Sequence, residues 1–313
     1  MGIIDCLSMP SARDIREYVA AETARRNRLA VPAFAGGFLY LLSAIIISET
    51  LNGAPTVGLV QGLAPALSGV ANPAVSPRAN EVKFISHHSF SLVAGSALAA
   101  IAVATLTLVL LLLVRATRFR RPETWAATLP LVLYGGIAVA TVSVGHQVVA
   151  AIETHNFAVS ANHSNSAVEH ALTTGTANVI VDYLDLFAGL ALAAGVIAAM
   201  TGALRVGLLP RWMGMLGILA GVLIFLPIGG AELQVVPAFW MVMMGILYVG
   251  KWPNGEPPAW AAGEAMPWPG RGTAGAAASA KGASPAPAGA GAAAVPAPTP
   301  VAGASSRKRR RKR

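Results

Sequence analysis

The chain has 313 residues, of which 55% are hydrophobic and only 12% charged, and its formal net charge is +9. A soluble domain usually carries about a quarter charged residues, so this composition excludes an ordinary soluble domain and indicates that apolar side chains face lipid. The single cysteine, Cys6, excludes an internal disulfide framework.

Residues 1–28 form a polar arm that carries five arginines. Pro10 and Ser11 resemble a helix start, so we expect a helix from about Ala12 to Arg26. Its apolar face is thin, which leaves two interpretations open: a helix lying on the membrane surface, or a solvated helical lead into the first span. The apolar run that follows is longer than a signal-peptide core, so we expect an uncleaved first helix.

Uncharged apolar runs long enough to cross a bilayer recur along the chain, since roughly 20 residues suffice for one helix. In lipid, every backbone polar group must be satisfied within its own segment, so these runs are expected to be helices rather than open strands. We therefore predict an all-α polytopic membrane protein whose residues 29–250 form a bundle of six transmembrane helices. The predicted spans are about 29–48, 89–114, 125–145, 186–204, 212–231 and 233–250.

The connections between these runs alternate in character. Residues 50–87 are rich in Gly, Pro, Ser and Asn and show no periodicity, and residues 146–185 contain no Lys or Arg. The short connections at 115–123 and 205–211 instead carry six arginines between them. We expect the first two segments to be long loops on one side of the membrane and the last two to be short turns on the other.

Two local motifs refine this outline. Ser166 and Glu169 match a capping box, which predicts a short helix inside the connection at 146–185. Gly217 and Gly221 are four apart in the fifth predicted span, a spacing typical of closely packed helices.

Cations divide unequally between the two sides of the predicted bundle. Of the 23 Lys and Arg residues, 21 lie on the side of the two termini, and only Arg78 and Lys83 lie on the other. Cytoplasmic loops of membrane proteins carry such an excess, so both termini are predicted to be cytoplasmic.

Residues 251–271 form a juxtamembrane segment with several prolines and with Trp252, Trp260 and Trp268 spaced eight apart. Tryptophan favours the headgroup level, so we expect this segment at the membrane interface or, alternatively, docked on another protein. Residues 272–313 consist mostly of Ala, Gly, Pro and Ser before a final basic block. Such a composition buries too little to fold, so the tail is predicted to be disordered.

The chain ends in seven consecutive cations, Arg307, Lys308, Arg309, Arg310, Arg311, Lys312 and Arg313. Cations on a tether are attracted to anionic headgroups, and they can also bind RNA or DNA without sequence preference. No aromatic residues interleave with the block and no nucleic-acid-binding fold is recognisable. We therefore expect the tail to contact anionic lipids of the inner leaflet rather than nucleic acid.

The side poor in Lys and Arg is rich in other titratable groups, because all six histidines and seven of the fourteen carboxylates fall there. Asp182 and Asp185 are three apart, so they share one face of a helix. Imidazole and carboxylate suit a divalent metal ion, and paired carboxylates near membrane depth can carry protons. The candidates for a metal or ion site are His88, His146, Asp182 and Asp185.

A plainer interpretation explains the same pattern. Each predicted span reaches the required length without these residues, so solvated side chains at the membrane boundary would give the same distribution. The sequence contains no His-Glu-x-x-His, nucleophile elbow, phosphate-binding Gly loop or dinucleotide fingerprint. It therefore offers no positive sign of catalysis, and no cofactor is expected.

Residues 205–226 contain Leu-Pro-Arg-Trp at 209–212 and Leu-Gly at 216–217. This segment resembles an uncharacterised family of bacterial six-span membrane proteins with such a turn before the penultimate helix. The Lys-Trp-Pro at 251–253 and the basic tail are similar to actinobacterial members of such families. The resemblance implies a six-helix bundle in a bacterial cytoplasmic membrane, and it implies no activity or site residues.

These patterns predict a multi-pass, non-enzymatic protein of the bacterial plasma membrane that acts through association with lipid or with other membrane proteins. The alternative is a small ion- or proton-coupled transporter that uses the Asp and His residues of the outer face. A membrane-embedded metal-dependent enzyme is the third interpretation.

Overall fold

The computed structural model describes residues 12–67, 69, 75–225, 231–253 and 255–266, all of which belong to the compact unit Met1–Trp268. The described residues are α-helical apart from their connections and one π-helical turn, and they form no strand. The all-α prediction is confirmed. The predicted disordered tail, Trp268 and the basic block at 307–313 lie outside the described residues.

Four described helices are long and apolar enough to cross a membrane. They are α1 (Ala12–Asn52), α4 (Ser89–Arg120), α5 (Thr128–Val159) and α7 (Thr176–Val206). Two shorter apolar helices, α8 (Arg211–Phe225) and α9 (Ala231–Tyr248), coincide with the last two predicted spans. The structure therefore describes a membrane protein built from apolar helices.

The first helix differs from the prediction in one respect. Residues 12–26 do not form a separate helix on the membrane surface, because α1 runs without a break from the polar arm into the apolar run, with Pro32 inside it. Glu22 and Arg26, which made the arm look solvated, are buried. The expectation of a helical lead into the first span is the one that the structure matches.

The long loop predicted at 50–87 is wrong in part, because it contains α2 (Leu59–Leu67) and α3 (Ala79–His87). The buried face of α3 is only Ala79 and Val82, which pack with Phe157, Val168 and Ala171. So short an apolar face leaves no visible periodicity in the sequence.

The loop predicted at 146–185 is largely helical, because α5 continues to Val159 and α7 begins at Thr176. Ionisable side chains ended the predicted spans, but they do not break a helix as proline or glycine would. Between them lie α6 (Asn165–Glu169) and the π-helix η1 (His170–Thr174). The predicted short helix is confirmed, but its N-cap is Ser164 rather than Ser166, and no side-chain cap is formed.

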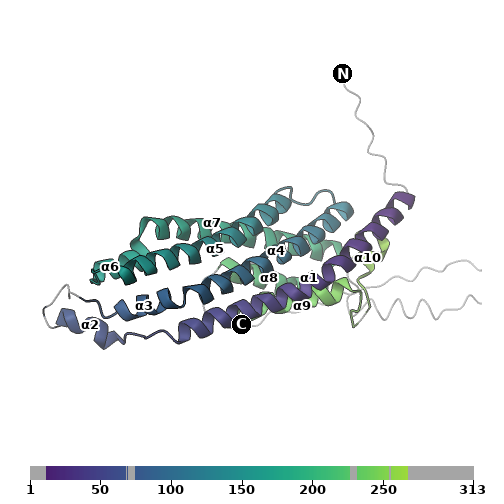
Figure 1. Cartoon of the computed structure of the whole chain (residues 1–313). Helices are drawn as coiled ribbons and strands as arrows, with labels where there is room; N and C mark the ends of the chain where they lie inside the picture. The colour runs from purple at the N-terminus through teal and green to yellow at the C-terminus, as the bar shows by residue number, and fades with distance from the viewer. Residues whose placement is uncertain (1–11, 68, 70–74, 226–230, 254, 267–313) are drawn as a thin grey trace, which may run out of the picture. The chain divides into compact units, whose positions relative to one another are not determined.

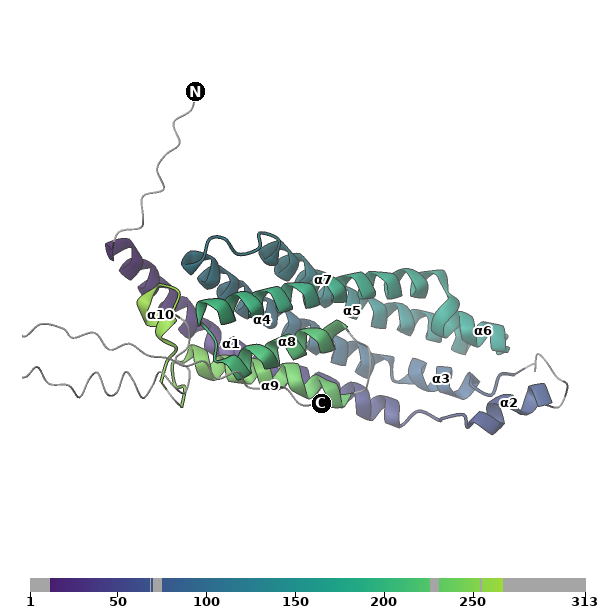
Figure 2. The same cartoon turned by 180° about the vertical axis from the view of Figure 1, so that it is seen from behind.

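The long helices pack as antiparallel neighbours. Figures 1 and 2 show α1 beside α9 and α5 beside α7, and α4 contacts both α1 and α5. Glycines let α5 and α7 approach closely: a Cβ on Gly135 would lie 2.7 Å from the Leu192 nitrogen, and one on Gly195 would lie 2.9 Å from the Val132 nitrogen. This reciprocal contact fixes the register of α5 against α7.

The predicted glycine motif of α8 is also a packing surface. Gly217 and Gly221 are buried, and a Cβ on Gly221 would lie 3.0 Å from Val196 Cγ1 of α7. A Cβ on Gly217 would lie 2.7 Å from Trp240 Nε1 of α9. The two glycines therefore allow α8 to pack closely against α7 and α9.

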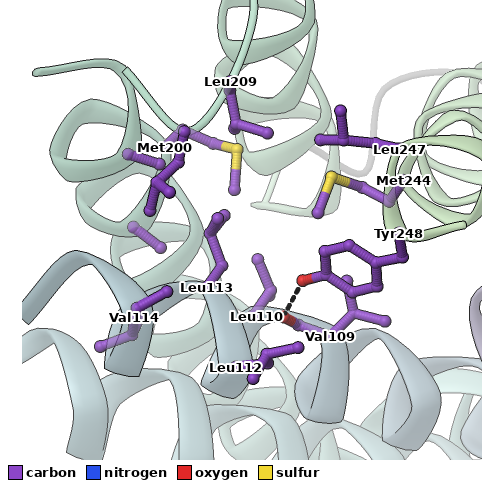
Figure 3. Close-up of a cluster of buried hydrophobic side chains, with 14 of the residues drawn as sticks. Val109, Leu110, Leu112, Leu113, Val114, Met200, Leu209, Met244, Leu247 and Tyr248 are labelled. Carbon is purple, nitrogen blue, oxygen red and sulfur yellow. Dashed lines mark hydrogen bonds between the residues drawn. The ribbon is translucent and has the colours of Figure 1, made fainter. Parts of the chain in front are cut away.

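The largest buried apolar cluster lies where α4, α7 and α9 meet (Figure 3). Leu110 and Leu113 of α4 and Met200 of α7 are wholly buried there. The hydroxyl of Tyr248, in α9, donates a hydrogen bond of 2.9 Å to the Val109 carbonyl oxygen (Figure 3). This bond satisfies the buried hydroxyl, and Trp240 Nε1 of the same helix donates a 3.2 Å hydrogen bond to the Met213 carbonyl oxygen.

Residues 251–253 and 255–266 fold back against this cluster and include α10 (Pro258–Ala262). Trp252 and Trp260 are buried, and Trp260 Nε1 donates a 2.9 Å hydrogen bond to the Leu208 carbonyl oxygen. These two rings are therefore not exposed for docking on another protein, and the predicted level of the segment at the membrane interface stays a prediction. The physical reason for their burial is that the rings fill the end of the chain's own bundle.

Five residues hold this segment in place, and we call them the clasp: Glu22, Arg26, Arg120, Glu256 and Trp260. Arg120 forms a two-bond ion pair with Glu22 at 2.7 and 2.9 Å, and Arg26 pairs with Glu256. The guanidinium groups of Arg26 and Arg120 lie 5.0 and 5.4 Å from the Trp260 ring centre, a cation–π arrangement. Charges from three distant parts of the chain thus neutralise one another inside the fold.

Candidate functional site

The candidate site is a cavity of about 380 Å³ between α1, α4, α5, α7, α8 and α9. Its size falls in the range of small-molecule sites, about 300–1,000 Å³. The wall is apolar along Val103, Leu106, Leu192 and Met241. Its polar lining residues are Tyr40, Ser43, Ser96, Ser143, His146, Gln147, Asp185 and Gln234.

The glycine contacts between α5 and α7 explain why two predicted residues meet here. Gly135 lies against Leu192 and Gly195 against Val132, so an antiparallel register carried along the helices brings His146 beside Asp182. The structure places His146 Nδ1 3.7 Å from Asp182 Oδ1. Asp185 lies almost one turn further along α7 and lines the cavity together with His146.

Two serine hydroxyls of the lining are satisfied by their own helices. Ser96 donates to the Val93 carbonyl oxygen at 2.8 Å, and Ser143 donates to that of Ala140 at 3.3 Å. Ser43 is different, because it is 1% exposed and its Oγ has no partner in the described part of the chain. An unsatisfied buried hydroxyl costs about 1–3 kcal/mol, so a polar occupant of the cavity would stabilise this wall.

The charge of the lining has one sign. Among the described residues of the lining, Asp185 is the single carboxylate, His146 is the single imidazole, and none is Lys or Arg. A cavity with this lining favours a cation or a neutral polar solute over an anion.

The two ends of the bundle differ in how the side chains next to the cavity are packed and exposed. We call the end that holds Arg120, Arg205 and the clasp the basic end, and the end that holds His146, Asp182 and Asp185 the histidine end. Toward the basic end, the wholly buried cluster of Figure 3 and the clasp lie beyond the cavity wall. At the histidine end, the side chains of His146 and Asp182 are 38% and 55% exposed. The polar part of the cavity therefore faces the histidine end.

His88, the fourth candidate, does not join this group. It precedes α4, its ring stacks on Phe84 with centroids 4.0 Å apart, and its Nδ1 lies 2.9 Å from the Phe84 carbonyl oxygen. These contacts give His88 a local role in the turn between α3 and α4, and it does not line the cavity.

Within the described ranges, no three His, Cys, Asp or Glu side chains lie close enough together to hold one metal ion. His146 and Asp182 alone would offer two ligands, whereas a zinc site ordinarily uses at least three from the protein. The described geometry therefore gives the metal-site interpretation no support.

The sequence analysis missed Tyr40, Ser43, Gln147 and Gln234. The signal was present, because Ser143, His146 and Gln147 have the i, i+3, i+4 spacing of one helix face, and Tyr40 and Ser43 are three apart in an apolar run. Uncharged polar residues inside a predicted span are therefore candidate site residues, just as the charged residues at its ends are.

Comparison of the chain with protein-family models, with curated proteins and with solved structures found no match. The resemblance to a bacterial six-span family stays a prediction. The function must therefore be argued from the geometry of the cavity.

Proposed function

We propose that the protein is a six-span transporter of the cytoplasmic membrane that binds a small cationic or polar solute in the cavity, with His146, Asp182 and Asp185 exchanging a proton. One observation carries this proposal: inside an otherwise apolar bundle lies a polar cavity whose described lining contains one carboxylate and no Lys or Arg. Association with lipid or protein alone would not need such a cavity.

The packing of α8 and α9 supports six spans. Both helices are apolar and pack along the long helices, α8 against α7 and α9 against α1. Six spans put both termini on the same side. Because cytoplasmic ends of membrane proteins carry an excess of cations, we expect the basic end in the cytoplasm and the histidine end on the outer side.

The depth of Asp185 supports proton exchange with water. At 1.5 Å per residue, Asp185 lies about 32 Å along α7 from Val206, close to the 30 Å thickness of the hydrocarbon core. A carboxylate at this boundary avoids the cost of burial at the bilayer centre. Imidazole is the side chain that ordinarily changes charge between pH 5 and 8, so a His–Asp pair suits proton uptake and release.

The direct test is proton flux in proteoliposomes that contain the full chain and a pH-sensitive dye. An imposed gradient of a small cation, tried in turn for sodium, potassium and ammonium-type ions, should drive proton movement. We expect Asp185→Asn and His146→Gln to lower this flux at least tenfold. Glu169→Gln is the matched control, because Glu169 is an exposed carboxylate that does not line the cavity.

Two results would overturn the proposal. One is the absence of flux for every cation tested in well-folded protein. The other is a flux that Asp185→Asn leaves at the level of the Glu169→Gln control.

A further inference from the structure

A second groove lies at the basic end, between α1 and α4, with a volume of about 330 Å³. Three arginines line it: Arg25 and Arg28 from α1 and Arg115 from α4. The rest of its lining consists of Leu29, Leu108, Leu111 and Leu112, and no carboxylate contributes. We propose that this groove binds one anionic phospholipid, with the phosphate held by the three arginines and an acyl chain laid along the leucines.

The arginines are available for such a ligand. The side chains of Arg25, Arg28 and Arg115 are exposed and form no hydrogen bond or ion pair with any described residue. Arg26 and Arg120 on the same two helices are instead buried and paired in the clasp. Among the described residues, the fold thus pairs two of these arginines internally and gives the three around the groove no ionic partner.

The position of the arginines at the ends of the apolar runs fits a lipid headgroup. Arg28 directly precedes the apolar run at 29–48, and Arg115 directly follows the run at 89–114. Both sides of the groove therefore present guanidinium groups where apolar helix begins. Basic pockets between transmembrane helices at the cytoplasmic face are suited to anionic headgroups, and arginine binds phosphate through two parallel hydrogen bonds.

The leucines continue the groove away from the arginines. Leu108, Leu111, Leu112 and Arg115 have the i, i+3, i+4, i+7 spacing of one helix stripe, so the stripe runs about 10 Å from the arginine into the apolar run. A free phosphate ion would use the arginines and leave the side chain of Leu108, which is 49% exposed, without an apolar contact. The apolar stripe is the reason to choose a phospholipid.

The groove is also held open at a fixed width. On the side of the arginines away from the leucines, the rings of Tyr18 on α1 and Phe119 on α4 stack with centroids 3.5 Å apart. The Tyr18 hydroxyl donates a hydrogen bond of 3.4 Å to the Arg115 carbonyl oxygen. The Glu22–Arg120 pair joins the same two helices. Because α1 and α4 are fixed here, the site is preorganised for one ligand geometry.

The test is lipid binding to the full chain in a neutral detergent, with bound lipids counted by native mass spectrometry. The probes are phosphatidylglycerol and phosphatidylcholine with the same acyl chains. We expect one tightly bound phosphatidylglycerol and no comparable phosphatidylcholine. The triple variant R25Q/R28Q/R115Q should bind phosphatidylglycerol roughly 100-fold more weakly, at about fivefold per cation.

The matched control is R309Q/R310Q/R311Q, which removes the same charge from the terminal block and should keep the tightly bound lipid. Equal losses in both triple variants would mean diffuse attraction and would overturn the groove. Displacement of the lipid by equimolar inorganic phosphate would show that the acyl chain is not needed, and this too would contradict the proposal.

A second pair of variants tests the leucine stripe without changing charge. Leu108 and Leu42 are 49% and 46% exposed, and only Leu108 lines the groove. Leu108→Ala should weaken phosphatidylglycerol binding roughly fivefold, which corresponds to partial loss of one leucine contact. Leu42→Ala should leave it unchanged, and equal effects would refute the acyl-chain part of the site. The groove does not depend on the proposed transport, because the two sites share no lining residue.

Discussion

At the basic end of the bundle, Leu110, Met200 and Met244 are wholly buried, and the charges of the clasp are paired inside the fold. At the histidine end, the same helices surround a polar cavity and leave His146 and Asp182 partly exposed. The difference indicates that packing at the basic end stabilises the bundle, whereas the histidine end is packed less tightly around a polar cavity. Functional sites are commonly placed in the less stable part of a fold.

The largest expected effect comes from breaking the clasp. Arg120→Met would leave Glu22, whose side chain is 3% exposed, without its partner. Removal of one partner of a buried ion pair costs about 3–5 kcal/mol, so we expect the free energy of unfolding to fall by that amount. Reversible unfolding in mixed detergent measures it. The double variant Glu22→Leu/Arg120→Met should recover most of the loss, and equal loss in both variants would show that the buried charge is not the cause.

A smaller effect is expected from separating α5 and α7. In Gly135→Ala, the new Cβ would lie 2.7 Å from the Leu192 nitrogen, so the helices must move apart. Overpacking of this kind costs about 1–3 kcal/mol, and the His146–Asp182 register should also be lost. Gly145→Ala is the control on the same helix, because nothing lies within 4 Å of its Cβ. It should be neutral or stabilising by up to about 1 kcal/mol, and a similar loss in both variants would contradict the close-packing account.

A third variant tests the cavity with little effect on the fold. Ser43→Ala removes a buried hydroxyl that has no described partner, so we expect the free energy of unfolding to rise by about 1 kcal/mol, the lower end of the cost of such a hydroxyl. Solute-driven proton flux should fall severalfold, because a polar contact of the occupant is lost. Ser96→Ala is the comparison, since that hydroxyl already bonds Val93. Unchanged flux in Ser43→Ala would remove this residue from the proposed site.

The smallest expected effect on stability belongs to the His146–Asp182 pair. Both side chains are partly exposed and their atoms are 3.7 Å apart, and such pairs contribute about 0–1 kcal/mol. Asp182→Asn should therefore leave the unfolding free energy nearly unchanged while it lowers proton flux. A loss of several kcal/mol would show that the histidine end is a structural element, contrary to the comparison above.

The sequence predicted the apolar helices well because long uncharged runs have few alternatives in lipid. It also placed His146 and Asp182 on the same side of the membrane. It could not predict their contact, because the register depends on Gly135 and Gly195 meeting backbone atoms of the neighbouring helix. It misread Glu22, Arg26 and Trp260, since a charge that is neutralised by a distant partner looks like a solvated charge until the fold brings the partners together.

The central claim is that the cavity is reached from the histidine end and closed at the basic end. It can be tested with Cys6→Ser protein that carries Ser43→Cys in the cavity wall or Met244→Cys in the buried cluster, in vesicles of known orientation. The measurement is labelling by a small, positively charged, membrane-impermeant thiol reagent. We predict labelling at position 43 from the histidine side only, and none at position 244 from either side. Equal labelling of position 43 from both sides, or no labelling there at all, would contradict the account.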